Sequence, residues 1–228
     1  MSNLRLVVFD MDGTLIDSQD VIIEAMGRAF ARIGMPAPSA EQTRAIIGLS
    51  LDEAVSTIAP DLSPAEVKAG VAAYRQSFIE MRAESGAEAA APMYPGARAA
   101  LERLHKQDAT LLGVATGKAR RGLDHAYASH GIGHFFVTHQ TADGHPSKPH
   151  PSMLFQALSD TGVDAGRAVM IGDTEFDITM GKAAGFATIG VSWGYHPLNR
   201  IKNAAPDCII DSYDELDAAL ENIWQAGS

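Results

Sequence analysis

Short apolar segments alternate with helical patterns over the C-terminal three fifths of the chain, and this alternation limits the possible folds more than any other feature. Runs such as "TLLGVAT" and "AVMIG" have the length and β-branched content of buried strands, and helical spacing of apolar residues follows each of them. Strands that alternate with helices build a parallel sheet covered on both faces. We therefore expect strands at 4–9, 110–116, 135–139, 168–172, 188–191 and 208–210, and helices at 97–104, 118–130, 151–162, 175–184 and 214–224.

A helical block interrupts this alternation after the first strand. Apolar residues from Val21 to Ile33 fall on one helical face, and a second stripe runs from Val67 to Met81. No strand pattern separates the two stripes. The sequence thus predicts an α/β fold with a doubly wound parallel core, residues 1–16 and 95–228, that carries an inserted all-helical cap, residues 17–94.

Composition excludes several classes of partner. The chain has 228 residues, of which 46% are hydrophobic, so it can bury a sizeable core. A formal net charge of −10 argues against non-specific nucleic-acid binding and against docking on anionic lipid. There is one cysteine, and the N-terminal residues carry no apolar signal-peptide core. We expect a cytoplasmic protein without nucleic-acid or membrane partners.

Polar residues cluster where the predicted strands end. Two carboxylates follow the first strand in "DMDGT", the second strand ends in "TGK", and a later strand ends in "GDTEFD". Ligands of open α/β sheets bind beyond the carboxyl ends of the strands. One crevice is therefore expected to hold the following side chains: Asp10, Asp12, Thr116, Lys148, Asp173 and Asp177.

This set has the chemistry of a divalent-cation site that handles phosphate. Crowded carboxylates repel one another, but Mg²⁺ prefers a few carboxylate oxygens together with water and substrate phosphate. A carboxylate such as Asp10 can act as a nucleophile and form an acyl-phosphate. Asp12 can then serve as general acid and base, and Gly13 allows a close backbone approach. Each residue also has a structural reading, because Asp-Gly pairs form turns and Asp173 and Asp177 can cap a helix.

The motifs "DMDGTL", "TGK", "KP" and "GDTEFD", in this order, resemble the four motifs of the haloacid dehalogenase-like hydrolase superfamily. The resemblance covers essentially the whole chain and is closest to the phosphoglycolate phosphatase-like branch with a helical cap. It implies a Rossmann-like core and a Mg²⁺-dependent phosphatase. The implied substrate is a small phosphorylated metabolite, with 2-phosphoglycolate as one candidate, and the implied intermediate is an aspartyl-phosphate.

The resemblance also implies residue roles. Asp10 is the expected nucleophile and a metal ligand, and Asp12 is the expected acid and base, whose backbone carbonyl also binds metal. Thr116 and Lys148 are expected to hold the phosphoryl oxygens. In full, the predicted substrate-binding residues are Gly13, Thr116, Gly117 and Lys148, and the predicted metal-binding residues are Asp10, Asp12, Asp173 and Asp177, the last as a supporting acid that reaches the metal through water.

The sequence departs from the family pattern at one position. Lys118 follows "TG" here, whereas phosphoglycolate phosphatases often have "TN" or "SN" before this lysine. The departure bears on the substrate more than on the reaction.

Three rival functions remain. One is a sugar-phosphate mutase of the same superfamily, which carries a cap-loop arginine for the second phosphate. Leu51 is at the matching position here, which argues against a mutase. A haloacid dehalogenase lacks the second aspartate of the first motif, which here is Asp12. The third is a non-catalytic binding protein of the same fold. The intact set of acids together with Lys148 argues against it, because binding alone does not require them.

Overall fold

The computed structural model describes residues 4–85 and 91–226, and its centre is a six-stranded sheet in the order β3-β2-β1-β4-β5-β6. Every neighbouring pair is parallel, which confirms the doubly wound α/β core. The strands are β1 (Arg5–Phe9), β2 (Thr110–Thr116), β3 (Thr138–Thr141), β4 (Ala168–Gly172), β5 (Ala187–Val191) and β6 (Cys208–Ile210). The helices are α1 (Gln19–Arg32), α2 (Ala40–Arg44), α3 (Leu51–Ile58), α4 (Pro64–Ser85), α5 (Ala97–His105), α6 (Arg120–His130), α7 (Ser152–Thr161), α8 (Glu175–Ala183), α9 (Leu198–Asn203) and α10 (Leu216–Ala226).

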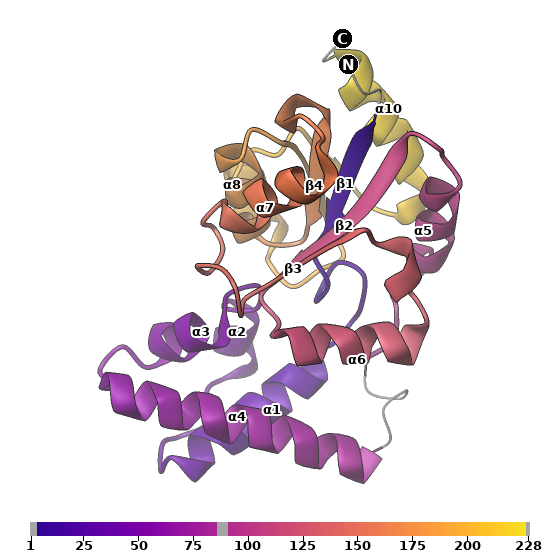
Figure 1. Ribbon diagram of the computed structural model, residues 1–228. Coiled ribbons are helices and arrows are strands. Elements are labelled where there is room, and N and C mark those ends of the chain that lie inside the picture. The colour runs from indigo at the N-terminus through magenta and orange to yellow at the C-terminus, as the bar shows by residue number, and fades with distance from the viewer. Residues whose placement is uncertain (1–3, 86–90, 227–228) are drawn as a thin grey trace.

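The central strand β1 is apolar on both sides because helices cover both faces of the sheet. Its residues alternate between two clusters, as the two-residue period of a strand requires. Val7 and Phe9 pack in the cluster that contains residues of α5, α6 and α10, whereas Leu6 and Val8 pack against residues of α7 and α8. Figure 1 shows α5 and α10 on one side of the sheet and α7 and α8 on the other.

The predicted strand 135–139 is wrong in its position. Gly133–Phe135 forms a 3₁₀ turn, and β3 begins only at Thr138. Phe135 and Phe136 are buried in the core beside α5 and α6, so their apolar character comes from packing and not from a strand. The strand itself is polar because it lies at the edge of the sheet, where Thr138 and the Gln140 amide donate hydrogen bonds to Asp160. The short helix α9 was not expected, whereas α2 lies within the cap that was predicted to be all helical.

The cap consists of α1 to α4, which gather beneath the sheet in Figure 1. Its own apolar cluster includes Met26, Phe30 and Val55, joined by Tyr195 from the core. Ile16 and Met93 pair in a β-bridge where the chain leaves and re-enters the core. The predicted division into 1–16, 17–94 and 95–228 stays a prediction, and residues 86–90 of the predicted cap lie outside the described residues. No helix in the described part of the chain combines the length and the apolar character needed to cross a membrane.

The cap loop before α3 lies directly on the core. A Cβ atom added to Gly117 would lie 2.4 Å from the carbonyl oxygen of Leu49 and 2.6 Å from that of Gly48, so only glycine fits there. The backbone N–H of Ser50 donates a hydrogen bond of 2.8 Å to Ser147 Oγ across the same boundary. This close approach accounts for the glycine that follows Thr116.

We predict that Gly117→Ala lifts this loop from the core. Overpacking against a rigid backbone costs about 1–3 kcal/mol, and the Ser50–Ser147 hydrogen bond lies next to the clash. Hydrogen exchange at the Ser50 amide should therefore accelerate by about tenfold or more. The matched control is Gly122→Ala, whose added Cβ would lie 3.7 Å from Lys118 side-chain atoms, an ordinary contact. Equal exchange rates in both variants would contradict this account of Gly117.

Candidate active site

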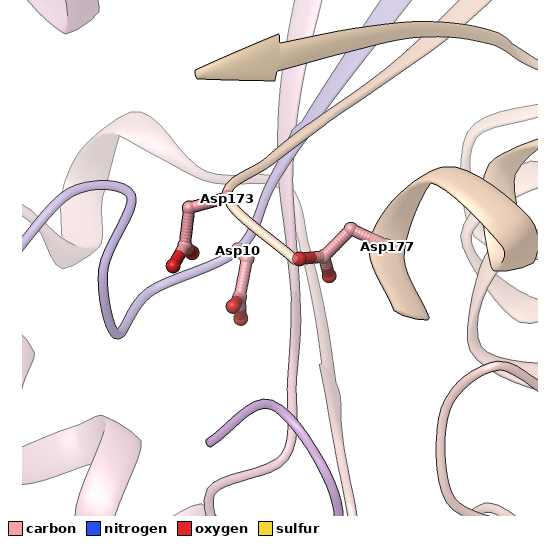
Figure 2. A group of neighbouring side chains, drawn as sticks. All are labelled: Asp10, Asp173 and Asp177. Atoms are coloured by element: carbon pink, nitrogen blue, oxygen red, sulfur yellow. The ribbon is translucent and has the colours of Figure 1, made fainter. Parts of the chain in front are cut away.

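Three buried carboxylates converge at the carboxyl ends of two adjacent strands. Asp10 follows β1, and its backbone N–H extends the pairing with β4 through a 2.9 Å hydrogen bond to the carbonyl of Ile171. Asp173 follows β4, and Asp177 lies in the first turn of α8. One oxygen atom from each of the three lies within 4.8 Å of the others (Figure 2). The structure thus brings together three of the four residues predicted to bind metal.

Glycines make room for this crowding. Gly13 has a φ of 86°, and a Cβ atom there would lie 2.2 Å from Asp173 Oδ2. A Cβ at Gly194 would lie 2.0 Å from the Cβ of Asp173 on another side. Gly13 was predicted from its motif, whereas Gly194 has no neighbouring signal in the sequence. Side chains at either position would push Asp173 out of the cluster.

Lys148 provides the counter-charge within the cluster. Its side chain is fully buried, and Nζ lies 2.8 Å from Asp10 Oδ1 and 2.7 Å from Asp177 Oδ1. Burial by itself lowers the pKa of Lys148, but the two carboxylates outweigh burial and raise it above its ordinary value. Lys148 therefore remains a cation.

Hydrogen bonds fix the other two carboxylates. Asp173 accepts from Thr14 Oγ1 at 2.9 Å and from the backbone N–H of Tyr195 at 2.8 Å. Asp177 Oδ2 accepts from the Thr174 hydroxyl and backbone N–H, so Asp177 forms a capping box at the start of α8 while its Oδ1 holds Lys148. Asp177 therefore caps α8, as one interpretation of the sequence predicted, and contacts Lys148 at the same time.

Asp10 differs from its neighbours. Both of its carboxylate oxygens are buried, and neither accepts a hydrogen bond within the described residues, although Lys148 forms an ion pair with one of them. Burial raises the pKa of Asp10 to about 7, with Asp177 and Asp12 adding to the shift and Lys148 opposing it. Burial also raises the pKa of Asp173, to which Asp177 and Asp10 contribute. One ammonium among three carboxylates leaves an excess of buried negative charge, and oxygen donors of this kind fit a hard divalent cation such as Mg²⁺.

Asp12 stands apart from the three-carboxylate cluster. Ser18 donates a short hydrogen bond to Asp12 Oδ1, and Lys118 Nζ lies 2.8 Å from the same oxygen. The predicted contact of Asp12 with metal runs through its backbone carbonyl and stays a prediction. Sequence reasoning missed Ser18 and the pairing of Lys118 with Asp12, because neither spacing in the sequence indicates that the side chains meet.

A cavity of about 780 Å³ opens from these residues toward the cap. Asp10, Asp12, Thr116 and Gly117 line its core side. Thr116 is fully buried at the end of β2, and its hydroxyl accepts from the backbone N–H of Lys118 at 3.2 Å. The other two residues of the predicted substrate set, Gly13 and Lys148, contact the carboxylates instead of lining this cavity. The cap side is lined by residues of α1, α3, α4 and the loop before α3.

We predict that Asp10→Asn stabilises the metal-free protein at alkaline pH. Because the folded pKa of Asp10 is raised, from 3.8 to about 7, its contribution to stability is present below about pH 4 and is lost as the pH rises through 7. Removing the charge should raise the free energy of unfolding by about 1–2 kcal/mol at pH 8, or the Tm by about 2–8 °C, and by little at pH 4.

Thermal unfolding in a chelator at both pH values checks this prediction. The control is Asp108→Asn, which removes the same charge from an exposed residue of the α/β core domain. Added Mg²⁺ should raise the Tm of the unmodified protein and leave that of Asp10→Asn nearly unchanged. A lower Tm for Asp10→Asn at pH 8 would mean that Asp10 is not under electrostatic strain.

Comparison with known proteins gives a consistent assignment. The family described as haloacid dehalogenase-like hydrolase matches residues 7–191. The chain is 36% identical to the probable phosphatase IndB of Dickeya dadantii, over 98% of this chain and 96% of that protein. It is 32% identical to a phosphoglycolate phosphatase of Vibrio parahaemolyticus, over 94% and 95% of the two chains. A predicted phosphoglycolate phosphatase from Haemophilus somnus has the same fold, with a TM-score of 0.83, 24% identity, and coverage of 96% and 99%. The chain therefore belongs to the haloacid dehalogenase-like hydrolase family, as its motifs predicted.

Proposed function

We propose that the protein is a Mg²⁺-dependent phosphatase that hydrolyses small phosphomonoesters through a phosphorylated Asp10. The observation that carries this proposal is the state of Asp10, a buried carboxylate that lines the cavity and that is held, within the described residues, only by its ion pair with Lys148. A carboxylate in this state is available both to a cation and to an electrophilic phosphorus. Relatives with phosphatase names over nearly the full chain support the same reaction.

The metal would be held by Asp10, Asp173 and the backbone carbonyl of Asp12. When bound, Mg²⁺ offsets the negative charge of the carboxylates and of the phosphate. Asp177 acts as the supporting acid in this proposal, because both of its oxygens are already engaged with Lys148 and Thr174. It fixes the lysine instead of binding the cation directly.

The reaction then proceeds in two transfers. An Asp10 oxygen attacks phosphorus, the bond from phosphorus to the ester oxygen breaks, and Asp12 donates its proton to the departing oxygen. Asp12 next takes a proton from water, whose oxygen attacks the phosphorus and releases phosphate, and Asp10 is regenerated. Lys148 and Thr116 hold the phosphoryl oxygens, and Ser18 and Lys118 keep the Asp12 carboxylate in one orientation.

The cap favours a small substrate, because the loop at Gly48 and Leu49 lies on Gly117 next to the site and a bulky ester would hold it away. We propose 2-phosphoglycolate as the first ester to test, on the likeness to the phosphoglycolate phosphatase of Vibrio parahaemolyticus. A sugar-phosphate mutase is the alternative, and the apolar Leu51 on the cavity wall speaks against it. Cytoplasmic action is part of the proposal, since the chain carries one cysteine.

A panel of phosphate esters with Mg²⁺ tests this function. It includes 2-phosphoglycolate, sugar phosphates, nucleotides and pyrophosphate, with a phosphoprotein and a nucleic acid as large substrates. We expect release of inorganic phosphate from small monoesters, and loss of that activity after exhaustive chelation with recovery on adding Mg²⁺. Turnover that persists without divalent ions would contradict the metal assignment, and no release from any ester would contradict the phosphatase itself. Conversion of a hexose 1-phosphate into its 6-phosphate would instead favour the mutase.

We predict that Asp10→Asn and Asp12→Asn fail in different ways. Asp10→Asn should abolish turnover with every ester, because an amide is a poor nucleophile. Asp12→Asn keeps the nucleophile and should lose about 10²–10⁴-fold in kcat with alkyl phosphates. The loss should be smaller with p-nitrophenyl phosphate, since its leaving group departs with little protonation.

The measurement is kcat for both esters in both variants. The control is Asp61→Asn, an exposed cap residue that does not line the cavity, and it should retain full activity. Equal losses with the two esters in Asp12→Asn would show that Asp12 is not the leaving-group acid.

A further inference from the structure

We propose that the preferred substrates carry a second anionic group, a carboxylate or a second phosphate, which Arg75 and Arg121 bind in the cavity. This inference rests on the proposed phosphatase function and deepens it. It concerns the part of the substrate that the chemistry at Asp10 does not touch.

The two arginines differ from the other arginines whose side chains belong to the described part of the structure. Among the arginines whose side chains the structure describes, Arg75 and Arg121 alone lack a hydrogen-bond acceptor, a carboxylate or an aromatic ring as partner. The immediate neighbour of Arg121 shows the usual situation, because Arg120 Nε lies 2.8 Å from Asp124 Oδ1. Both unpaired side chains belong to residues that line the cavity above Asp10.

They approach the cavity from opposite sides. Arg75 lies on the cap helix α4, between Tyr74 and Phe78, and Arg121 lies in the first turn of the core helix α6. Lys118, just before α6, has its Nζ 6.0 Å from the centre of the Phe78 ring, so the two helices face each other across the cavity. A ligand gripped by both arginines would therefore connect the cap to the core.

Lys118, which also lines the cavity, already has a carboxylate partner. Lys118 pairs with Asp12 at 2.8 Å, and its side chain is only 15% exposed. Arg75 and Arg121 are exposed and have no such partner. Carboxylates of Asp52, Glu53 and Asp143 also line the cavity, in a chain with a net charge of −10, so an anionic substrate needs local cations to enter and stay.

The chemistry of the two side chains selects the ligand. A guanidinium group presents parallel N–H donors that match the oxygens of a carboxylate or phosphate. Apolar residues, among them Leu49, Tyr74 and Phe78, line the same cavity. A cavity of about 780 Å³ has room for a longer ester than a two-carbon acid. The inferred class is thus a phosphomonoester with a distal anion, of which 2-phosphoglycolate is a short member.

Matched pairs of esters test the inference. 4-Carboxyphenyl phosphate is compared with 4-carbamoylphenyl phosphate, and 3-phosphoglycerate with glycerol 3-phosphate, to probe a carboxylate. Glucose 1,6-bisphosphate is compared with glucose 6-phosphate to probe a second phosphate. We expect kcat/KM to favour the member with the distal anion in at least one pair, and the pair that shows it identifies the anion.

The variants Arg75→Gln and Arg121→Gln should each lower that preference by about tenfold. This factor corresponds to the lower end of the range for losing one hydrogen bond to a charged group. The change should arise mainly in KM for the anionic member. Arg120→Gln is the matched control, since it removes the same charge one residue away from Arg121 and leaves the preference as it was.

The outcomes separate the two proposals. If the enzyme hydrolyses the neutral members at least as well in every pair, or if Arg120→Gln alters the preference as much as Arg121→Gln, the distal-anion site is wrong and the phosphatase stands. If no ester is hydrolysed in the presence of Mg²⁺, both proposals fail. Loss of preference in only one of the two variants would overturn the shared grip across the cavity.

Discussion

The buried ion pairs of Lys148 are the interaction on which the rest of the site depends. Three carboxylates with oxygens within 4.8 Å of one another could not remain ionised in the core without a cation. Lys148 forms ion pairs with two of them, Asp10 at 2.8 Å and Asp177 at 2.7 Å, and within the described residues Asp10 has no further partner. The site is therefore incompletely neutralised, which is the condition under which a divalent cation and a phosphate dianion can bind together.

The sheet and its glycines create that condition. Adjacent parallel strands β1 and β4 end at the same edge, so Asp10 and Asp173 must be neighbours. Gly13 and Gly194 leave Asp173 the space that a Cβ atom would take. On the cap side, the absence of a Cβ atom at Gly117 leaves space for the backbone carbonyl of Leu49. Glycines therefore allow two close contacts, one that brings the carboxylates together and one that places the cap loop against the core.

The sequence predicted the parts of this arrangement that follow from chain order and period. The carboxyl ends of parallel strands lie at the same edge of a sheet, so the sequence alone predicted that Asp10, Thr116 and Asp173 lie together. Contacts between side chains distant in sequence gave no such signal, and Ser18, Lys118 and Gly194 were therefore missed as partners. The position of the strand expected at 135–139 was wrong for another reason. Phe135 and Phe136 are buried in the hydrophobic core without being part of a strand, so their apolar character misled the prediction.

The proposed reaction transfers the phosphoryl group first to Asp10 and then to water, and the stereochemical course at phosphorus reveals whether both transfers occur. A substrate whose phosphoryl group is chiral by virtue of oxygen isotopes and sulfur is hydrolysed in isotopically labelled water, and the configuration of the released thiophosphate is determined. Two successive in-line displacements, first by Asp10 and then by water, predict retention of configuration. Inversion would show that water attacks the ester in a single step, and the covalent role assigned to Asp10 would be wrong.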